Sequence, residues 1–401
     1  MRRNLLPILM SMVVLSPLAI DIYLPSMPNM AMEFGVSASE IQSTLVLFLF
    51  AMGTGQLLIG PLADRYGRRP IALAGILLYC LSSLLAATAV DFHWLQIARV
   101  LQGLAACATS IVVFSAVRDS FSAKDGAHYY SYLNGMICVI PALAPTLGGM
   151  LALQFGWRST FVFMMLYATL VIIYVGYRLP ETRPAETISE GPLYRWARYK
   201  PILLEPHFLF YAFICMVGMT SILSYVSYAP VWIIEHLGLS ELTFSGLFAL
   251  NAVINIMACF AAPLVMKQLG NRGTVILALG CLFVAGSLQL ILKEWGPNSG
   301  FEAALSFMLP ILLLCIGFAL LLGPATSMAL SVFGERAGTA TAILGFIQMS
   351  GASLLAGLVQ QTSLSAPYAV GLVMLVLSSI SIGIMKTKSL SHWHEQKILS
   401  E

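Results

Sequence analysis

The chain has 401 residues, of which 59% are apolar and only 10% are charged, whereas about a quarter are charged in an average soluble domain. A soluble core cannot hide that much apolar surface, so the composition excludes an ordinary soluble protein. The formal net charge of +3 is spread along the loops and calls for no nucleic-acid partner.

The apolar residues come in runs of about 18 to 25, the length that crosses a hydrocarbon layer of about 30 Å at about 1.5 Å per residue. A lipid-exposed backbone must satisfy its own hydrogen bonds, so each run is predicted to be a helix. We therefore expect an all-α membrane protein with twelve transmembrane helices. The predicted spans are residues 5–28, 41–62, 70–89, 94–116, 129–152, 158–178, 206–233, 243–266, 273–292, 303–328, 338–360 and 366–385.

Positive charge is biased to one side of these spans. Of the 21 basic residues, 18 lie at the chain ends or in the even-numbered loops. The odd-numbered loops hold Arg158 and Lys293 together with seven acids. Since positive charge marks the cytoplasmic side, we expect both termini in the cytoplasm and a multi-pass protein of the cell inner membrane.

The longest polar stretch divides the chain into two halves of six spans. We predict an N-terminal bundle over 1–178, a cytoplasmic linker over 179–205, a C-terminal bundle over 206–385 and a cytoplasmic tail over 386–401. After span eight, the segment from Pro263 to Arg272 weakly repeats the segment from Pro61 to Arg69 after span two. Two pseudo-symmetric six-helix bundles around a midplane cavity are therefore expected.

Span one holds Asp21, the single acid inside any predicted span, in the run from Ala19 to Pro28. It lies about 24 Å along the helix from residue 5, in the outer half of the membrane. A carboxylate in a low-dielectric cavity favours its neutral form and can carry a proton near neutral pH, unlike one among lipid headgroups. We therefore predict that Asp21 binds and releases protons.

The loop after span two carries glycines and charges at fixed spacings, namely Gly60, Asp64, Arg65, Gly67, Arg68 and Arg69. It resembles the Gly-x-Leu-Ala-Asp-Arg-x-Gly-Arg-Arg/Lys loop of major facilitator superfamily transporters. The resemblance implies the major facilitator fold and a gating motif. We expect Asp64 to pair with an arginine and face the amides of a helix N-terminus, with Gly60 and Gly67 permitting close approach. The alternative is a generic positively charged cytoplasmic loop, which would require the three arginines but would not explain the spacing of Gly60, Asp64 and Gly67.

Span four contains Leu95, Arg99, Gln102 and Gly103 in a pattern that resembles the proton-coupling motif of drug/proton antiporters in this superfamily. An arginine inside a span costs about 2.5 kcal/mol or more, so Arg99 is expected to face the protein interior or a wet cavity. The alternative is that Arg99 snorkels to the membrane surface.

Span five holds an antiporter-like motif that consists of small residues and prolines. It runs from Pro141 through Pro145 to Gly148 and Gly149, although Ile140 and Ala144 stand where the antiporter pattern has glycines. Such residues permit close helix packing and a bend.

The span-one and span-five runs, with Arg118-Asp119 and Glu181-Thr182, resemble the Bcr/CflA branch of the superfamily, which includes bicyclomycin, chloramphenicol and florfenicol exporters. In the C-terminal half the resemblance is mainly one of hydropathy. Polar or adaptable residues there are candidate substrate contacts, the alternative being interhelical packing. They are Met216, Met219, Tyr225, Tyr228, Trp232, Asn251, Asn255 and Gln348.

The motifs of other function classes are missing from the sequence. There is no phosphate-binding Gly-x-x-x-x-Gly-Lys-Ser/Thr loop, the six histidines lie in loops or at span ends, and the seven cysteines stand singly. We therefore expect no enzyme activity, no metal and no cofactor, with a proton gradient as the energy source. The resemblance implies a monomer.

The expected function is proton-coupled efflux of small amphipathic drugs, such as chloramphenicol-type antibiotics, by alternating access. In this function Asp21 and Arg99 would couple transport to protons, and Asp21 and Tyr23 would contact the substrate. The expected partners are a drug-like small molecule, protons and the lipid bilayer. Because the motifs do not encode direction, the alternative is a proton-linked transporter of a metabolite such as a nucleoside or sugar. A membrane receptor is a further alternative, which would be expected to carry an appended signalling domain.

Overall fold

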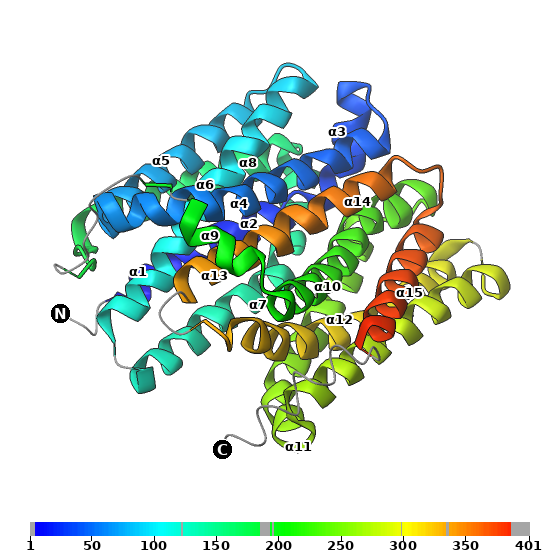
Figure 1. The fold of residues 1–401 in the computed structure, drawn as a ribbon. Helices are drawn as coiled ribbons and strands as arrows, with labels where there is room; N and C mark the ends of the chain where they lie inside the picture. The colour runs from blue at the N-terminus through cyan, green and yellow to red at the C-terminus, as the bar shows by residue number, and fades with distance from the viewer. Residues whose placement is uncertain are drawn as a thin grey trace. The chain divides into compact units, whose positions relative to one another are not determined.

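The computed structural model describes residues 5–121, 123–184, 193–194, 196–297, 299–333 and 337–385. The predicted tail and part of the predicted linker, 185–192 and 195, lie outside the described residues. Within that part the protein is all-helical, which confirms the predicted fold class (Figure 1). Eleven helices there are long and apolar enough to cross a membrane. One of them, α11 (Glu241–Trp295), breaks at Gly270, where φ is +66°, so its two arms bring the number of spans to the predicted twelve.

The chain forms two compact units. Unit 1 comprises Met1–Arg195 and Ile233–Val253, and unit 2 comprises Trp196–Trp232 and Ile254–Glu401. Residues 233–253 group with unit 1, where two hydrogen bonds tie the first turns of α11 to other helices. The Asn29 amide donates to Glu241 over 2.7 Å, and the Ser245 hydroxyl donates to the Pro145 carbonyl over 3.1 Å. The predicted bundle boundaries and the cytoplasmic termini stay predictions.

The first span of unit 1 is the most irregular, because four prolines remove backbone donors from it. It is divided into α1, α2, the 3₁₀ turn η2 and α3, and the remaining spans of the unit are long single helices. Their bounds are α1 Leu5–Val13, α2 Leu15–Asp21, η2 Leu24–Ser26, α3 Met27–Phe34, α4 Ala38–Tyr66, α5 Arg68–Ala87, α6 Phe92–Ser120, α7 Ala123–Phe155 and α8 Arg158–Arg178.

Helix α6 lies at the centre of unit 1, packed against α4 and α5. Small residues make this packing close. A Cβ atom added at Gly103 would overlap the carbonyl oxygen of Phe48 on α4, and one added at Gly75 on α5 would lie 2.7 Å from the Cβ of Ala108. The close crossings place the polar side chains of α6 inside the unit.

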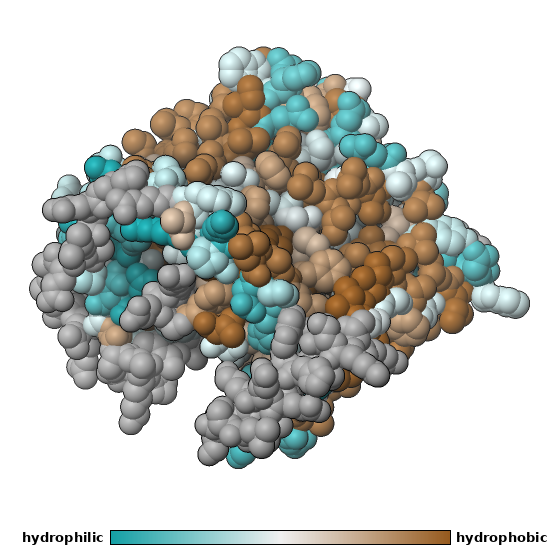
Figure 2. All heavy atoms as spheres, viewed as in Figure 1, coloured by the Kyte–Doolittle hydropathy of each residue, from teal (hydrophilic) through white to brown (hydrophobic). Residues whose placement is uncertain are grey.

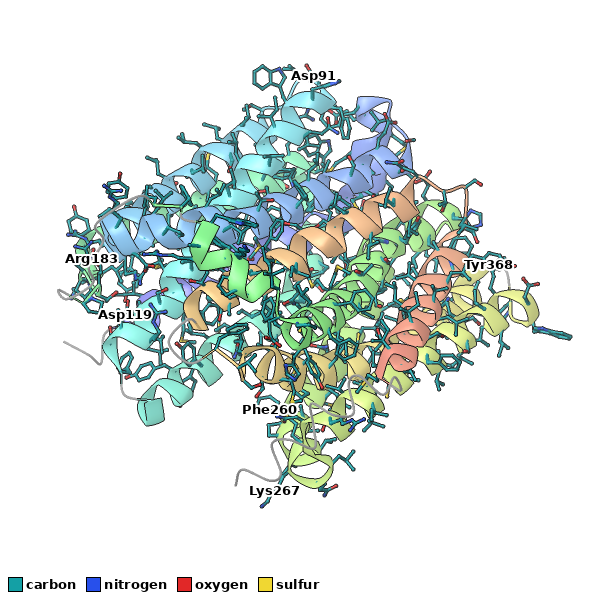
Figure 3. The ribbon with its side chains drawn as sticks, viewed as in Figure 1. Asp91, Asp119, Arg183, Phe260, Lys267 and Tyr368 are labelled. Carbon is teal, nitrogen blue, oxygen red and sulfur yellow. The ribbon has the colours of Figure 1, made fainter. Side chains whose placement is uncertain are left out.

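The end of unit 1 opposite the arginine-rich loop is held by a polar and aromatic cluster. The Glu33 carboxylate accepts a 2.6 Å hydrogen bond from the Trp157 indole and pairs with the Arg158 guanidinium. Arg158 also donates to the Ala89 carbonyl over 3.1 Å and lies over the Trp157 ring. This cluster joins α3, α8 and the turn after α5, near Asp91 in Figure 3.

Unit 2 is built around α10, which packs against α12, α14, α15 and η4. Gly286 and Gly317 bring the second arm of α11 against α15 and α12. Two short π-helical segments occur in this half of the chain: η3 ends the helix that α10 begins, and η4 lies between α13 and α14. Such segments occur often at functional sites. The bounds are α9 Trp196–Leu203, α10 Pro206–Pro230, η3 Val231–His236, α12 Gly300–Leu330, α13 Ala337–Phe346, η4 Ile347–Gly351, α14 Ala352–Gln360 and α15 Ala366–Met385.

Large apolar side chains are exposed along the spans, as lipid contact requires. Leu77, Leu81 and Leu84 form such a stripe on α5, and Leu166 and Leu170 form one on α8. Much of the face drawn in Figure 2 is apolar, with hydrophilic residues gathered toward its ends.

Candidate functional site

Asp21 is the last residue of α2; regular α-helix is interrupted directly after it, where a turn at Ile22 and Tyr23 leads into the 3₁₀ helix η2. Its side chain is buried, with 3% of the residue exposed. No hydrogen bond or ion pair joins its carboxylate to another of the described residues. A broken helix at membrane depth is tolerated only where protein or a wet cavity surrounds it. The break and the isolated acid thus occupy one place in the interior of unit 1.

Arg99 on α6 is completely buried, so its head group does not reach the membrane surface. Its guanidinium lies 4.5 Å from the ring centroid of Tyr23 and 4.6 Å from that of Phe48. One nitrogen donates to the Gln102 side chain, while Nε and Nη2 have no hydrogen-bond partner among the described residues. Cation–π contacts are worth about 2 kcal/mol when desolvated, so the two rings stabilise a charge that burial penalises.

The groups around Arg99 are anchored by a second layer of hydrogen bonds. Gln102 donates to the Ser83 hydroxyl on α5 over 2.9 Å. The hydroxyls of Tyr23 and Thr44 lie 3.2 Å apart, which ties the chain just after Asp21 to α4. The predicted residues Tyr23, Arg99 and Gln102 are thus brought together. The sequence analysis did not include Ser83 and Thr44, although the three-residue spacing of Arg99 and Gln102 on one helix did indicate a shared face.

Helix α7 presses directly on the chain beside Asp21. A Cβ atom at Gly148 would overlap the carbonyl oxygen of Ile22, the residue after Asp21. At Gly149 an added Cβ would have its nearest heavy atom, the Ser245 hydroxyl oxygen, 3.4 Å away. Pro141 and Pro145 lie inside the same helix. Gly148 therefore sets the distance between α7 and the break, whereas Gly149 does not.

The arginine-rich loop forms a charge cluster at the other end of unit 1. Arg68 is buried and pairs with Asp64 over 2.7 Å and with Asp119 on α6 over 3.0 Å. Arg118 pairs with the other oxygen of Asp119 over 3.1 Å. Asp119 and Arg183 mark this end in Figure 3. The cluster ties the α4–α5 turn to the end of α6.

Glu181, which follows α8, holds the first amides of α5. Its carboxylate accepts hydrogen bonds from the backbone nitrogens of Arg68, Arg69 and Arg183 over 2.8, 3.2 and 2.9 Å. The predicted pairing of Asp64 with an arginine is thus present, whereas the α5 amides that Asp64 was also expected to face are bound by Glu181. Burial raises the pKa of Glu181, but the backbone hydrogen bonds outweigh burial and hold that pKa below its usual range.

The two glycines of the loop differ in their surroundings. Gly67 has a φ of +105°, and a Cβ atom there would collide with the Glu181 carboxylate. An added Cβ at Gly60 would meet no heavy atom within 4 Å, so the close approach expected there is not present. The backbone carbonyl of Arg65 accepts a hydrogen bond from the Arg183 side chain. The Arg69 side chain donates a hydrogen bond to the Gly176 carbonyl over 2.7 Å.

Replacing Glu181 by Gln should lower the free energy of unfolding by about 0.5–2 kcal/mol at neutral pH, the range for loss of a helix N-cap. The folded-state pKa is lowered, so the stabilisation is present above the usual titration range of a glutamate and is lost as the pH falls through the folded pKa. Thermal unfolding in detergent between pH 3.5 and 7 would measure this. Glu205→Gln is the matched control, and equal losses from both variants would contradict the assigned role.

The candidate substrate contacts of the second half lie on four elements, α10, η3, α11 and η4. Met216 packs on Gly351 of η4, the segment that carries Gln348. Tyr225 is buried in α10, and the Tyr228 hydroxyl donates to the Val359 carbonyl over 3.1 Å. Met219 lies on α10 and Trp232 on η3. The last two lie on α11, where Asn251 belongs to unit 1 and Asn255 belongs to unit 2 and donates to the Cys315 carbonyl over 3.1 Å.

In the part of the chain that the structure describes, no three His, Cys, Asp or Glu side chains are placed to hold a metal ion.

Comparison with known proteins gives a consistent result. A family model described as Major Facilitator Superfamily matches residues 9–356. The chain is 32% identical to Multidrug resistance protein MdtL of Klebsiella pneumoniae over 375 residues, covering 94% of this chain and 93% of that protein. It is 32% identical to the MdtL of Shewanella oneidensis, covering 93% of each chain.

Two solved structures have a similar fold at low sequence identity. The crystal structure of a D-xylose-proton symporter has a TM-score of 0.72 and 16% identity, covering 94% of this chain and 96% of that one. A partially occluded, inward-open structure of the xylose transporter XylE from E. coli has a TM-score of 0.74 and 16% identity, covering 95% and 96%. At this identity the likeness concerns the fold alone.

Proposed function

Because the chain belongs to the Major Facilitator Superfamily, we propose that it exports small amphipathic drugs across the cell inner membrane in exchange for protons. The superfamily is one of transporters, and the apolar helices make this chain a multi-pass membrane protein. The cargo is inferred from relatives that are named multidrug resistance proteins. Chloramphenicol-type antibiotics are the first compounds to test.

The buried, unpaired carboxylate of Asp21 is the observation that carries the proton coupling. A carboxylate without water or partners favours the neutral form, so it takes up a proton when the surroundings exclude water and releases it when they open. Asp21 would bind a proton from outside and release it to the cytoplasm. Each cycle would change the charge beside the α2 break by one unit.

Arg99 is proposed to couple that charge to movement of the helices. It lies on α6, which packs against α2, and two of its nitrogens have no partner among the described residues. An ionised Asp21 would attract this guanidinium, and a protonated one would release it. Because Arg99 is held by Tyr23, Phe48 and Gln102, a change in its position would move α4, α6 and the turn between α2 and η2 together.

The substrate would contact adaptable and aromatic groups of both units. Tyr23 in unit 1 and Met216, Tyr225, Tyr228 and Gln348 in unit 2 are the proposed contacts, together with Asn251 and Asn255. Apolar lining with a few polar anchors suits amphipathic compounds. The charge cluster around Arg68 and Asp64 is proposed to be the gating element against which these movements work.

A susceptibility panel tests the proposed cargo. An efflux-deficient bacterium that expresses the chain should tolerate chloramphenicol-type antibiotics and some cationic dyes better than the same strain with an empty vector. Collapse of the proton gradient should raise drug accumulation to the level of the vector control. Unchanged susceptibility across the panel, with uptake or release of a labelled nucleoside or sugar, would instead favour the metabolite alternative.

A further inference from the structure

Helix α2 is a short segment between two interruptions of regular helix. Pro17 has no N–H to donate to the carbonyl of Val13. In the same way, Pro25 has none to donate to the carbonyl of Asp21. The structure accordingly ends α1 at Val13 and α2 at Asp21. Since helices bend where a proline removes such a hydrogen bond, the seven residues of α2 are joined to the chain by two sites of bending.

Tyr79 of α5 holds the end of α2 that lies away from Asp21. Its hydroxyl donates a 2.8 Å hydrogen bond to the carbonyl of Leu15, the first residue of α2. Tyr79 is completely buried, so bulk water does not compete for this bond. At the Asp21 end, the Tyr23 hydroxyl lies 3.2 Å from the hydroxyl of Thr44 on α4. The segment is therefore tied at both ends through hydroxyl groups, by α5 at one end and by α4 at the other.

The same face of α5 also anchors the partner of Arg99. Ser83 lies four residues after Tyr79 and therefore on the same side of the helix. Its hydroxyl accepts a hydrogen bond from Gln102 over 2.9 Å. The thioether sulfur of Met164 on α8 lies 3.4 Å from the Tyr79 hydroxyl and 3.7 Å from the Gln102 amide nitrogen. One turn of α5 thus contacts both α2 and the side chain that is bonded to Arg99.

Tyr167 of α8 makes a similar bond on the other side of the first interruption. Its hydroxyl donates to the carbonyl of Ser11 over 2.9 Å, and Ser11 belongs to α1. The carbonyls of Ser11 and Leu15 are four residues apart, so the two tyrosines contact the same side of the first span. Of these two bonds, only that of Tyr79 reaches the segment that ends in Asp21.

Charged side chains are scarce around α2, which packs against α1, α6, α7 and α8. Among the described residues, the buried charged side chains are Asp21, Arg68 and Arg99. Arg68 belongs to the charge cluster at the arginine-rich end of unit 1, so Arg99 is the single other buried charge on the helices that surround α2. The remaining titratable groups in the middle of these helices are tyrosines and cysteines, which are neutral at acidic pH. They are Tyr23, Tyr79, Cys80, Cys107, Cys138 and Tyr167.

Given the proposed function, on which this inference rests, we propose that α2 moves as one segment with Asp21 and that Tyr79 is its positioning residue. The bond to Leu15 holds α2 where the Asp21 carboxylate has no hydrogen-bond or ion-pair partner among the described residues. Without that bond, α2 bends more freely at its two interruptions, and the carboxylate reaches Arg99 or water. Both stabilise the ionised form, so a lower pH is then needed to protonate Asp21.

Drug efflux by Tyr79→Phe in inverted membrane vesicles tests the proposal, because this change removes the hydroxyl and keeps the ring. Efflux driven by a pH gradient should fall by about threefold to tenfold, the equivalent of one hydrogen bond. The interior pH that gives half-maximal efflux should fall by about 0.5 to 1 unit. Drug exchange without a gradient should be unchanged, because it needs no proton. Tyr167→Phe, the matched control, should lose a similar amount of thermal stability but keep the pH profile of the wild type.

A comparison with Asp21→Asn separates this inference from the proposed function. If Asp21→Asn abolishes gradient-driven efflux while Tyr79→Phe and Tyr167→Phe share the wild-type pH profile, the positioning role of Tyr79 is overturned and the proposed function stands. Full gradient-driven efflux by Asp21→Asn would overturn both.

Hydrogen exchange of the wild-type chain covers the case in which Tyr79→Phe does not fold. After correction for intrinsic rates, raising the pH through the ionisation of Asp21 should speed amide exchange in α2 and leave α1 unchanged. An equal response of α1 and α2 would show that α2 does not move as a separate segment, which would overturn the proposal.

Discussion

Asp21→Asn is expected to abolish drug efflux driven by a pH gradient while leaving the protein folded. The amide has nearly the same size as the carboxyl group but cannot bind and release a proton. One proton moving down about 150 mV supplies about 3.5 kcal/mol, enough for a drug gradient of a few hundredfold, and this drive should be lost. Transport into inverted membrane vesicles after acidification of their interior is the measurement.

Two controls make the Asp21 result specific. Glu302→Gln removes an exposed acid at the start of α12 and should transport like the wild type. Drug exchange without a pH gradient should survive in Asp21→Asn, because exchange of drug for drug needs no proton. Full gradient-driven efflux by Asp21→Asn would show that the proton is carried elsewhere.

Gly148→Ala should damage both stability and transport, because the new methyl group would occupy the space of the Ile22 carbonyl oxygen. Overpacking of this kind typically costs about 1–3 kcal/mol, and here a backbone atom must move. Helix α7 would be displaced from the break after Asp21, so we expect a lower unfolding midpoint and efflux reduced by about tenfold or more.

The adjacent glycine supplies the matched control for Gly148. Gly149→Ala adds the same methyl group to the same helix, where its nearest contact is at 3.4 Å. It should remain close to the wild type in unfolding midpoint and efflux. If the two variants lose equal amounts of unfolding midpoint or of efflux, the close approach at Ile22 does not explain the role of Gly148.

Hydropathy and charge predicted the spans, because lipid imposes a minimum length and a high cost on buried charge. The same cost predicted that Arg99 faces the protein interior, and in the structure Arg99 is completely buried. A break between spans eight and nine was expected from polarity, and Gly270 provides it with a positive φ.

The contacts that complete the site could not be predicted from the sequence, because they join residues that are far apart along the chain. Glu181 reaches an amide 113 residues away, and Glu33 reaches an arginine 125 residues away. In the sequence, each of these two acids looks like an ordinary charged residue of a loop, so its partner could not be inferred. The π-helical segments η3 and η4 were not predicted either, and η4 packs against α10, which is more than 100 residues earlier in the chain. Which residues meet substrate stays a prediction.

The bond between Glu181 and the start of α5 has a consequence for dissecting the chain. A fragment ended at Arg178, where α8 ends, would contain every span of the first half but would leave the α5 amides without their acceptor. The shortest autonomous N-terminal fragment therefore extends at least through Arg183, whose side chain donates to the Asp64 and Arg65 carbonyls. Half-length versions of this protein, built to be recombined as two polypeptides, should be divided after that residue.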